Sequence, residues 1–230
     1  MQSLLEIDKE LLMLLNGSGS MFVDNMSLVL TSGLTWIPLY LSLLYIIIKN
    51  TETMKQILLI IGCVLLCVAL SEGVTDFIVK PLVGRLRPSY DPIMKYSIDT
   101  VNGVRGGGQY GFFSAHAANT FGLALFSSLL IRDRRLTLAL LAWAFVNGWT
   151  RIYLGLHYPL DVLVGFVWGT VVGLVAYGVY IKSYLSMFPH FNYVSSQYTL
   201  SGYNRSDVDV VLFVLSLTLF YAIIKSLIFI

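Results

Sequence analysis

Charged residues are scarce in this sequence. Lysine, arginine, aspartate and glutamate together make up 12% of the 230 residues, about half the fraction found in an average soluble domain. Hydrophobic residues make up 57%, and the mean hydropathy is +0.76. A chain with so few charges lacks the polar surface of a water-soluble domain. The composition therefore excludes an ordinary soluble protein and indicates a protein of the lipid bilayer.

Residues that bind metals are scarce as well. The two cysteines, Cys63 and Cys67, lie four residues apart in an apolar run without polar neighbours, so we expect them to pack in a helix interior. There is no zinc-type pair of cysteines or histidines, and the acidic residues form no two-metal pattern. We therefore expect no metal and no cofactor. The net charge of +2 is spread over loops, which gives no reason to expect a nucleic acid partner.

The amino terminus lacks the basic start and the long apolar core of a secretion signal. Glu6, Asp8 and Glu10 stand where basic residues would be expected. Leucine and isoleucine recur around them with helical spacing, so we expect a helix that lies along the membrane surface. Residues 1–26 are accordingly predicted to be an interfacial segment.

Long apolar runs, by contrast, are abundant. A helix needs about 20 mostly apolar residues to cross the hydrocarbon core, and six runs approach or exceed that length. We therefore predict an all-α, polytopic membrane bundle of about six transmembrane helices, folded as one domain over residues 1–230. The predicted spans cover residues 27–48, 57–79, 112–131, 136–151, 162–181 and 210–230.

The basic residues in short connections predict the orientation, because lysine and arginine favour the cytoplasmic side. If the chain crosses the membrane six times, seven basic residues fall on the same side, which we expect to be cytoplasmic. They are Lys49, Lys55, Arg132, Arg134, Arg135, Lys182 and Arg205. The loop 80–110 then faces outward. His190, one of three histidines, falls in a cytoplasmic loop. We expect an integral protein of the bacterial inner membrane whose functional side faces the periplasm.

Polar residues collect in three clusters at the predicted outer ends of the helices. The first is Lys80-Pro81-Leu82-Val83-Gly84-Arg85-Leu86-Arg87-Pro88, the second Phe113-Ser114-Ala115-His116, and the third runs from Thr150-Arg151 through His157 to Asp161. Ionisable groups at the hydrocarbon edge are costly unless they are paired or used. We therefore expect the three clusters to form one site.

Together the clusters resemble the motifs of the type 2 phosphatidic acid phosphatase superfamily, which are Lys-x6-Arg-Pro, Pro-Ser-Gly-His and Ser-Arg-x5-His-x3-Asp. Phe113 and Ala115 replace proline and glycine of the second motif, and Thr150 replaces serine of the third while keeping the hydroxyl. The resemblance covers about residues 57–181, the expected catalytic core. It implies a membrane phosphatase that forms a phosphohistidine intermediate and acts on lipid phosphates.

The basic side chains and the amino-terminal ends of the predicted helices suit a phosphate group, which carries up to two negative charges. Lys80, Arg87 and Arg151 supply positive charge from several directions. Ser114 can present its hydroxyl before a helix, with the N–H groups of Ala115 and His116 beside it. Arg85 fits a phosphate ligand and an interfacial anchor equally well, and Thr150 is a further candidate. Because cations take the place of magnesium, the site requires no metal.

The third cluster supplies the nucleophile. Pro159 suits a first helical turn and leaves His157 just outside the helix, while Asp161 can fix the tautomer of the His157 ring. In the resembling family this histidine is phosphorylated. His116 is then the candidate for the general acid that protonates the leaving oxygen and later activates water.

Two other features have more ordinary interpretations. Glu72, Asp76 and Lys80 are spaced by four, which predicts a structural charge ladder on one helix face. Tyr153 and Tyr158 are expected in the aromatic belt at the interface.

The expected substrate is a lipid phosphate or pyrophosphate of the bacterial envelope, such as undecaprenyl pyrophosphate, a lipid A phosphate or phosphatidylglycerol phosphate. The motifs do not distinguish among these head groups, and no obligate protein partner is inferred. A transporter or flippase could use the same charged cluster, although the paired broken helices of transporters are missing. A vanadate-dependent haloperoxidase shares the anion pocket but is soluble.

Overall fold

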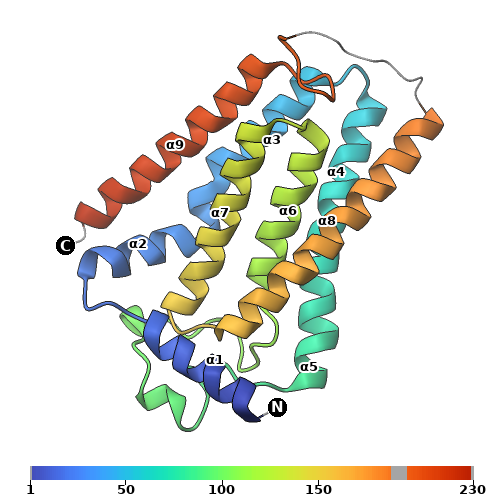
Figure 1. Ribbon diagram of the computed structural model, residues 1–230. Helices are drawn as coiled ribbons and strands as arrows, with labels where there is room; N and C mark the ends of the chain where they lie inside the picture. The colour runs from blue at the N-terminus through green and yellow to red at the C-terminus, as the bar shows by residue number, and fades with distance from the viewer. Residues whose placement is uncertain (1, 188–195, 229–230) are drawn as a thin grey trace.

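Helices that run side by side along one axis form the body of the protein in the computed structural model, which describes residues 2–187 and 196–228 (Figure 1). The α-helices are α1 (Gln2–Leu15), α2 (Met21–Thr31), α3 (Ile37–Asn50), α4 (Met54–Val68), α5 (Lys80–Val83), α6 (Ala115–Ile131), α7 (Arg134–Tyr153), α8 (Pro159–Met187) and α9 (Arg205–Ile228). Two π-helical segments, Ala69–Gly73 and Thr75–Val79, connect α4 to α5, so that the helix continues from Met54 to Val83. His190 lies outside the described residues.

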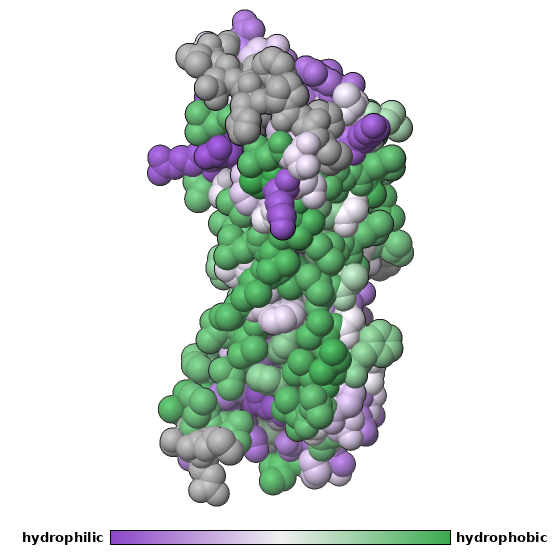
Figure 2. Space-filling model, turned by 90° about the vertical axis from the view of Figure 1, so that its right-hand side faces the viewer, coloured by the Kyte–Doolittle hydropathy of each residue, from purple (hydrophilic) through white to green (hydrophobic). Residues whose placement is uncertain are grey.

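The predicted membrane bundle is confirmed. Four helices of the described chain are long and apolar enough to cross a bilayer: Gly33–Asn50, Met54–Val83, Pro159–Ser186 and Arg205–Ile228. Helices α6 and α7 run along the same axis between them (Figure 1). The surface agrees with this arrangement, because Figure 2 shows a hydrophobic waist with hydrophilic residues gathered toward both ends.

The first predicted span, residues 27–48, is wrong in its boundary. The helix breaks at Ser32, whose backbone is extended, and a 3-10 turn from Gly33 to Trp36 leads into α3. Two side chains satisfy carbonyl groups near the end of α2, because the Thr35 hydroxyl donates to Val29 O at 2.6 Å and the Trp36 indole donates to Leu30 O at 2.8 Å. These bonds stabilise a bend that hydropathy alone does not reveal.

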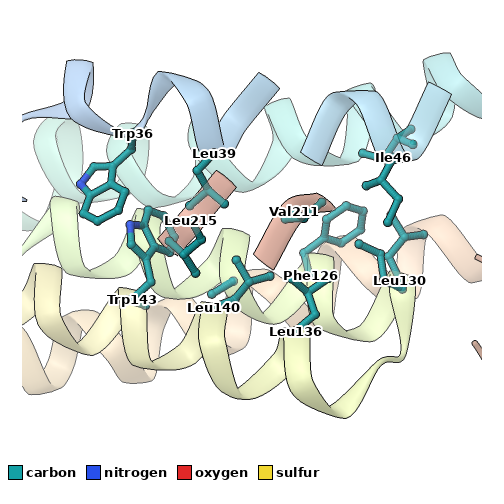
Figure 3. Close-up of a cluster of buried hydrophobic side chains, with 14 of the residues drawn as sticks. Trp36, Leu39, Ile46, Phe126, Leu130, Leu136, Leu140, Trp143, Val211 and Leu215 are labelled. Carbon is teal, nitrogen blue, oxygen red and sulfur yellow. The ribbon is translucent and has the colours of Figure 1, made fainter. Parts of the chain in front are cut away.

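A hydrophobic core fills the half of the bundle opposite α1. It joins side chains of α3, α6, α7 and α9, and Figure 3 shows Trp36 facing Trp143 across it. The two indole rings meet edge to face, with 5.6 Å between their centres. Cys63 and Cys67 are buried in the same core, as predicted. The residues labelled in Figure 3 are Trp36, Leu39, Ile46, Phe126, Leu130, Leu136, Leu140, Trp143, Val211 and Leu215.

Helices α6 and α8 approach each other so closely that only glycine fits between them. A Cβ atom at Gly165 would lie 2.7 Å from the carbonyl oxygen of Ser114, and one at Gly169 would lie 2.6 Å from that of Ala118. Gly173 continues the same row, one turn further along α8. Small residues spaced by four let two membrane helices pack backbone to backbone. This contact fixes the start of α6 against the start of α8, where two of the three polar clusters lie.

We expect Gly169→Ala to destabilise the protein by about 1–3 kcal/mol, because the added methyl group must push α6 away from α8. Gly178→Ala is the matched control, since a Cβ atom at Gly178 on the same helix meets no atom within 4 Å and alanine favours helix. Thermal unfolding of both variants in one detergent measures the effect. Equal melting temperatures for the two variants would contradict the close contact.

Candidate active site

The three polar clusters lie together at one end of the bundle. Backbone hydrogen bonds join them: Gly111 N donates to Arg85 O at 2.8 Å, Arg87 N donates to Gln109 O at 2.8 Å, and Ser114 N donates to Asp161 O at 3.0 Å. The first bond ties the loop of the first cluster to the segment before α6, and the last ties the second cluster to the third. Residues separated by about 75 positions in the chain thus form one framework.

Two arginines provide positive charge, of which Arg87 is buried and Arg151 half-buried. Arg87 is 4% exposed, and its Nη1 lies 3.0 Å from Nε2 of His157 and 3.2 Å from the Leu156 carbonyl oxygen. Arg151 donates from Nη1 to the Thr31 hydroxyl at 2.7 Å. Burial lowers the pKa of Arg87, although nearby carboxylates oppose this effect.

Neither arginine has a carboxylate partner. Among the described residues, Arg87 and Arg151 form no salt bridge, and the Nε–H of each is buried without an acceptor. Lys80, by contrast, is paired with Asp76. A buried or half-buried guanidinium group without a counter-ion is costly. An anion bound between them would satisfy both the charge and the free N–H groups.

His157 has the surroundings of a neutral nucleophile. It is 2% exposed, in the turn between α7 and α8, and α8 begins at Pro159 as predicted. Because a guanidinium group can only donate, the Arg87 contact requires an unprotonated Nε2 on His157. Burial lowers the pKa of His157 well below its ordinary value, and the charges of Arg87 and Arg151 lower it further. The imidazole therefore stays neutral, with its Nε2 lone pair toward the cations.

Asp161 lies on the other side of the His157 ring. Its Oδ2 is 3.6 Å from Nδ1 of His157 and accepts a hydrogen bond from Tyr158 N at 3.1 Å. The distance of 3.6 Å exceeds a hydrogen bond, so the predicted bond between the two side chains is not formed in this structure. The carboxylate still faces the ring atom that carries the proton when Nε2 is free, which favours this tautomer.

His116 lies in the first turn of α6, and its Nε2 is buried without a hydrogen-bond partner among the described residues. Arg151 is the charge that acts on its ring, and the Asn147 side chain is its polar neighbour. Arg151 also acts on His157. The two histidines therefore share one guanidinium group as a neighbour, which agrees with the predicted convergence of the clusters.

The two hydroxyl groups of the motifs serve their own helices. Ser114 caps α6, since its Oγ accepts a bond from Ala117 N at 3.3 Å, and Thr150 donates to Asn147 O at 2.7 Å. Both residues are fully buried. Ala115 occupies the first helical turn with a negative φ, so alanine replaces the glycine of the family motif without backbone strain.

Arg85 is neither a free phosphate ligand nor a surface anchor in this structure. Its Nη1 donates to Oδ1 of Asp161 at 2.6 Å, and its Nη2 donates to Oδ2 of Asp8 at 2.5 Å. The guanidinium group lies over the ring of Tyr158, 4.1 Å from the ring centre. The prediction that Tyr153 and Tyr158 belong to the aromatic belt is wrong, because each is 2% exposed. Tyr158 instead helps to hold Arg85.

The sequence analysis missed Asp8. This carboxylate is 4% exposed, and its Oδ1 also accepts a hydrogen bond from Leu160 N, in the first turn of α8, at 2.8 Å. A signal was present, because Asp8 shares one face of α1 with Leu12, which is fully buried. An acidic residue on the apolar face of an amphipathic helix indicates a buried partner. Helix α1 thus reaches Asp161 through Arg85.

The predicted charge ladder is only partly formed. Lys80 Nζ pairs with Asp76, four residues earlier. Glu72 does not continue the ladder, and its Oε1 accepts a hydrogen bond from Asn119 Nδ2 of α6 at 3.0 Å instead. The π-helical turns between these residues change the spacing that an α-helix would give.

Buried cations around a neutral histidine, at the end of an apolar helical bundle, are typical of a membrane-bound phosphatase. The family model of the PAP2 superfamily matches residues 60–184. The chain belongs to this superfamily, as its motifs predicted. It is a phosphatase of the membrane that hydrolyses lipid phosphates.

Three curated relatives give the range of similarity. The Lipid A 4'-phosphatase of Bacteroides thetaiotaomicron is 42% identical over 174 residues, which cover 75% of this chain and 76% of the relative. The Lipid A 4'-phosphatase of Porphyromonas gingivalis is 33% identical over 181 residues, 79% of this chain and 76% of the relative. The Undecaprenyl-diphosphatase of Bacillus subtilis is 25% identical over 126 residues, which cover 55% of this chain and 58% of the relative. No solved structure matches. These relatives favour the phosphatase over the transporter and haloperoxidase hypotheses.

We expect Asp8→Asn to reduce kcat about tenfold, because the loss of one charge-assisted bond frees Arg85 to shift and changes the position of Asp161. Glu10→Gln is the matched control, since Glu10 is an exposed carboxylate on the same helix. Phosphate release from one lipid substrate measures both variants. An Asp8→Asn variant with the kcat of Glu10→Gln would show that the α1 carboxylate does not position the site.

Proposed function

We propose that the protein removes a phosphate monoester from a lipid A-type head group at the outer face of the inner membrane, through a phosphohistidine at His157. One observation carries the proposal: Arg87 is buried beside Nε2 of His157, and neither Arg87 nor the half-buried Arg151 has a carboxylate partner among the described residues. A phosphoryl group between them would complete the site. The substrate is suggested by the two relatives with the highest identity given above.

In the first step, Nε2 of His157 attacks phosphorus while the guanidinium groups of Arg87 and Arg151 hold the equatorial oxygens. The bond from phosphorus to the sugar oxygen breaks, and His116 gives its proton to that oxygen. Asp161 faces Nδ1 and stabilises the positive charge that the ring acquires. Dephosphorylated lipid leaves, and the phosphoryl group stays on Nε2.

In the second step, His116 takes a proton from a water molecule, and the resulting hydroxide attacks phosphorus. The bond from phosphorus to Nε2 breaks, inorganic phosphate leaves, and His157 returns to its neutral form. Lys80, which lies close enough for its charge to act on His157, adds to the positive field. The residues of this chain thus supply the charge that a metal supplies in other phosphatases.

The positions of the helix ends support the proposed outer location. The site lies at the end of the bundle that also holds α1, whereas Lys49, Arg135 and Arg205 lie at the other end (Figure 1). Basic residues in short connections favour the cytoplasm, which supports a site that faces outward. A lipid there places its phosphate at the interface while its chains remain in the hydrocarbon layer.

We expect a covalent intermediate to accumulate in His116→Ala when the substrate is a radiolabelled nitrophenyl phosphate. This leaving group needs no proton, so the first step proceeds, whereas water activation slows by about a hundredfold to ten-thousandfold. Denatured protein should carry label that acid releases and alkali does not. The double variant His116→Ala with His157→Ala is the control, and label on it would exclude His157 as the nucleophile.

The substrate is tested with a lipid panel in buffer that contains a metal chelator. We expect faster phosphate release from a lipid A 4'-phosphate than from undecaprenyl pyrophosphate or phosphatidylglycerol phosphate. The rate on each lipid should be the same with and without the chelator, because cations of the chain replace the metal. Phosphate assays on one purified preparation give the three rates. A faster rate on the pyrophosphate would exclude the proposed head group, and loss of activity in chelator would exclude the metal-free mechanism.

A further inference from the structure

Glu72 and Asn119 form a polar pair among the spanning helices that the phosphate chemistry does not use. Oε1 of Glu72 accepts a hydrogen bond from Nδ2 of Asn119 at 3.0 Å. Glu72 is exposed in the π-helical segment Ala69–Gly73, and π-turns in helices are frequent at functional sites. A carboxylate within a spanning helix is expensive and indicates a function unless it is paired with a cation. No salt bridge of Glu72 occurs in the described part of the chain.

The pair lies at the rim of a cavity. The cavity has a volume of about 430 Å³ between α3, α4, α6 and α7, and Asn119 is one of its lining residues. Its other walls are mostly apolar and include Ile47, Val68, Leu123 and Trp143. Leu44 and Leu65 also line it and are 37% and 62% exposed, so the cavity opens sideways toward lipid between α3 and α4.

The cavity begins close to the active site along α6. Asn119 follows His116 by three residues on α6, which is about 4.5 Å along the helix axis. Leu123 and Ser127, which line the cavity, continue the same face at intervals of four residues. On α4, Val68 lies one turn before Glu72. If the phosphate of a lipid lies beside His116, a chain of that lipid would therefore pass Glu72 and Asn119 before it enters the apolar part of the cavity.

Two unpaired oxygen atoms at the rim of the cavity indicate which chemical group the lipid chain carries. Oδ1 of Asn119 is buried and has no partner in the described chain, and Oε2 of Glu72 makes no hydrogen bond there either. Both atoms only accept hydrogen bonds. A plain hydrocarbon chain would leave them unpaired and desolvated, whereas a hydroxyl or an amide N–H would satisfy one of them. A site built around such acceptors discriminates strongly against an analogue without the donor.

We propose that this cavity holds one chain of the substrate and that Glu72 and Asn119 select chains with a hydroxyl or amide N–H close to the head group. The selection rests on the proposed function, since it assumes that the phosphate of the same lipid lies beside His116 and His157. It separates acylated sugar phosphates with hydroxylated or amide-linked chains from polyprenyl phosphates, whose chains carry no donor.

Two synthetic lipids test the proposal. They share a phosphorylated sugar head group and one ester-linked acyl chain of the same length, without an amide N–H, and they differ only in a hydroxyl near the carbonyl end of the chain. The wild-type enzyme should hydrolyse the hydroxylated lipid with a kcat/KM higher by about tenfold or more, the effect of one hydrogen bond to a charged acceptor. In Glu72→Gln and in Asn119→Leu, this ratio should fall several-fold toward one.

Glu52→Gln is the matched control, because Glu52 is an exposed carboxylate outside the helices, at the other end of the bundle. It should keep the wild-type ratio. Equal rates of the wild-type enzyme on the two lipids would overturn the selection even if both variants failed to fold, while leaving the proposed function intact. An unchanged ratio in both variants would likewise overturn the role of this pair. Release of phosphate from neither lipid would contradict the proposed function itself.

Discussion

The contact between α6 and α8 is the constraint on which the arrangement of the site depends. Gly165 and Gly169 let the backbone of α8 lie against that of α6, and Ser114 N donates to Asp161 O where the two helices begin. His116 and His157 belong to different helical hairpins, and neither position is set by local sequence. Their separation is fixed by backbone atoms, which are stiffer than side chains. A reaction that needs two imidazoles on opposite sides of one phosphorus atom requires this stiffness.

Around this pair of helices, charge is distributed unequally. Asp161 is surrounded by donors from Arg85 and the Tyr158 amide, and Arg85 is shared with Asp8. Arg87 and Arg151 have no such partners among the described residues. Asp8 and Asp161 thus pair with Arg85, which leaves the remaining arginines for the phosphate group that we propose as substrate. Helix α1 contributes to this balance through Asp8, so the amino-terminal segment is part of the site's support.

Much of this architecture could be predicted from the sequence, because it follows from local rules. Apolar length identified the membrane bundle, and proline at position 159 placed His157 outside α8. The rest depended on contacts between distant segments. The break at Ser32 relies on side-chain bonds back to α2, and the burial of Tyr158 relies on Arg85. The charge ladder predicted from spacing by four does not include Glu72, because the helix there is π-helical, which no periodicity in the sequence indicates.

The unpaired guanidinium groups also have a consequence for the enzyme between turnovers. Arg87 and Arg151 lie close enough for the charge of one to act on the other, and a tetrahedral anion bound between them would relieve this repulsion. Orthophosphate, the product, fits that description as well as the substrate does. The same electrostatic design that attracts lipid head groups thus makes the enzyme prone to retain its product, and ambient phosphate would slow turnover while making the folded protein harder to unfold.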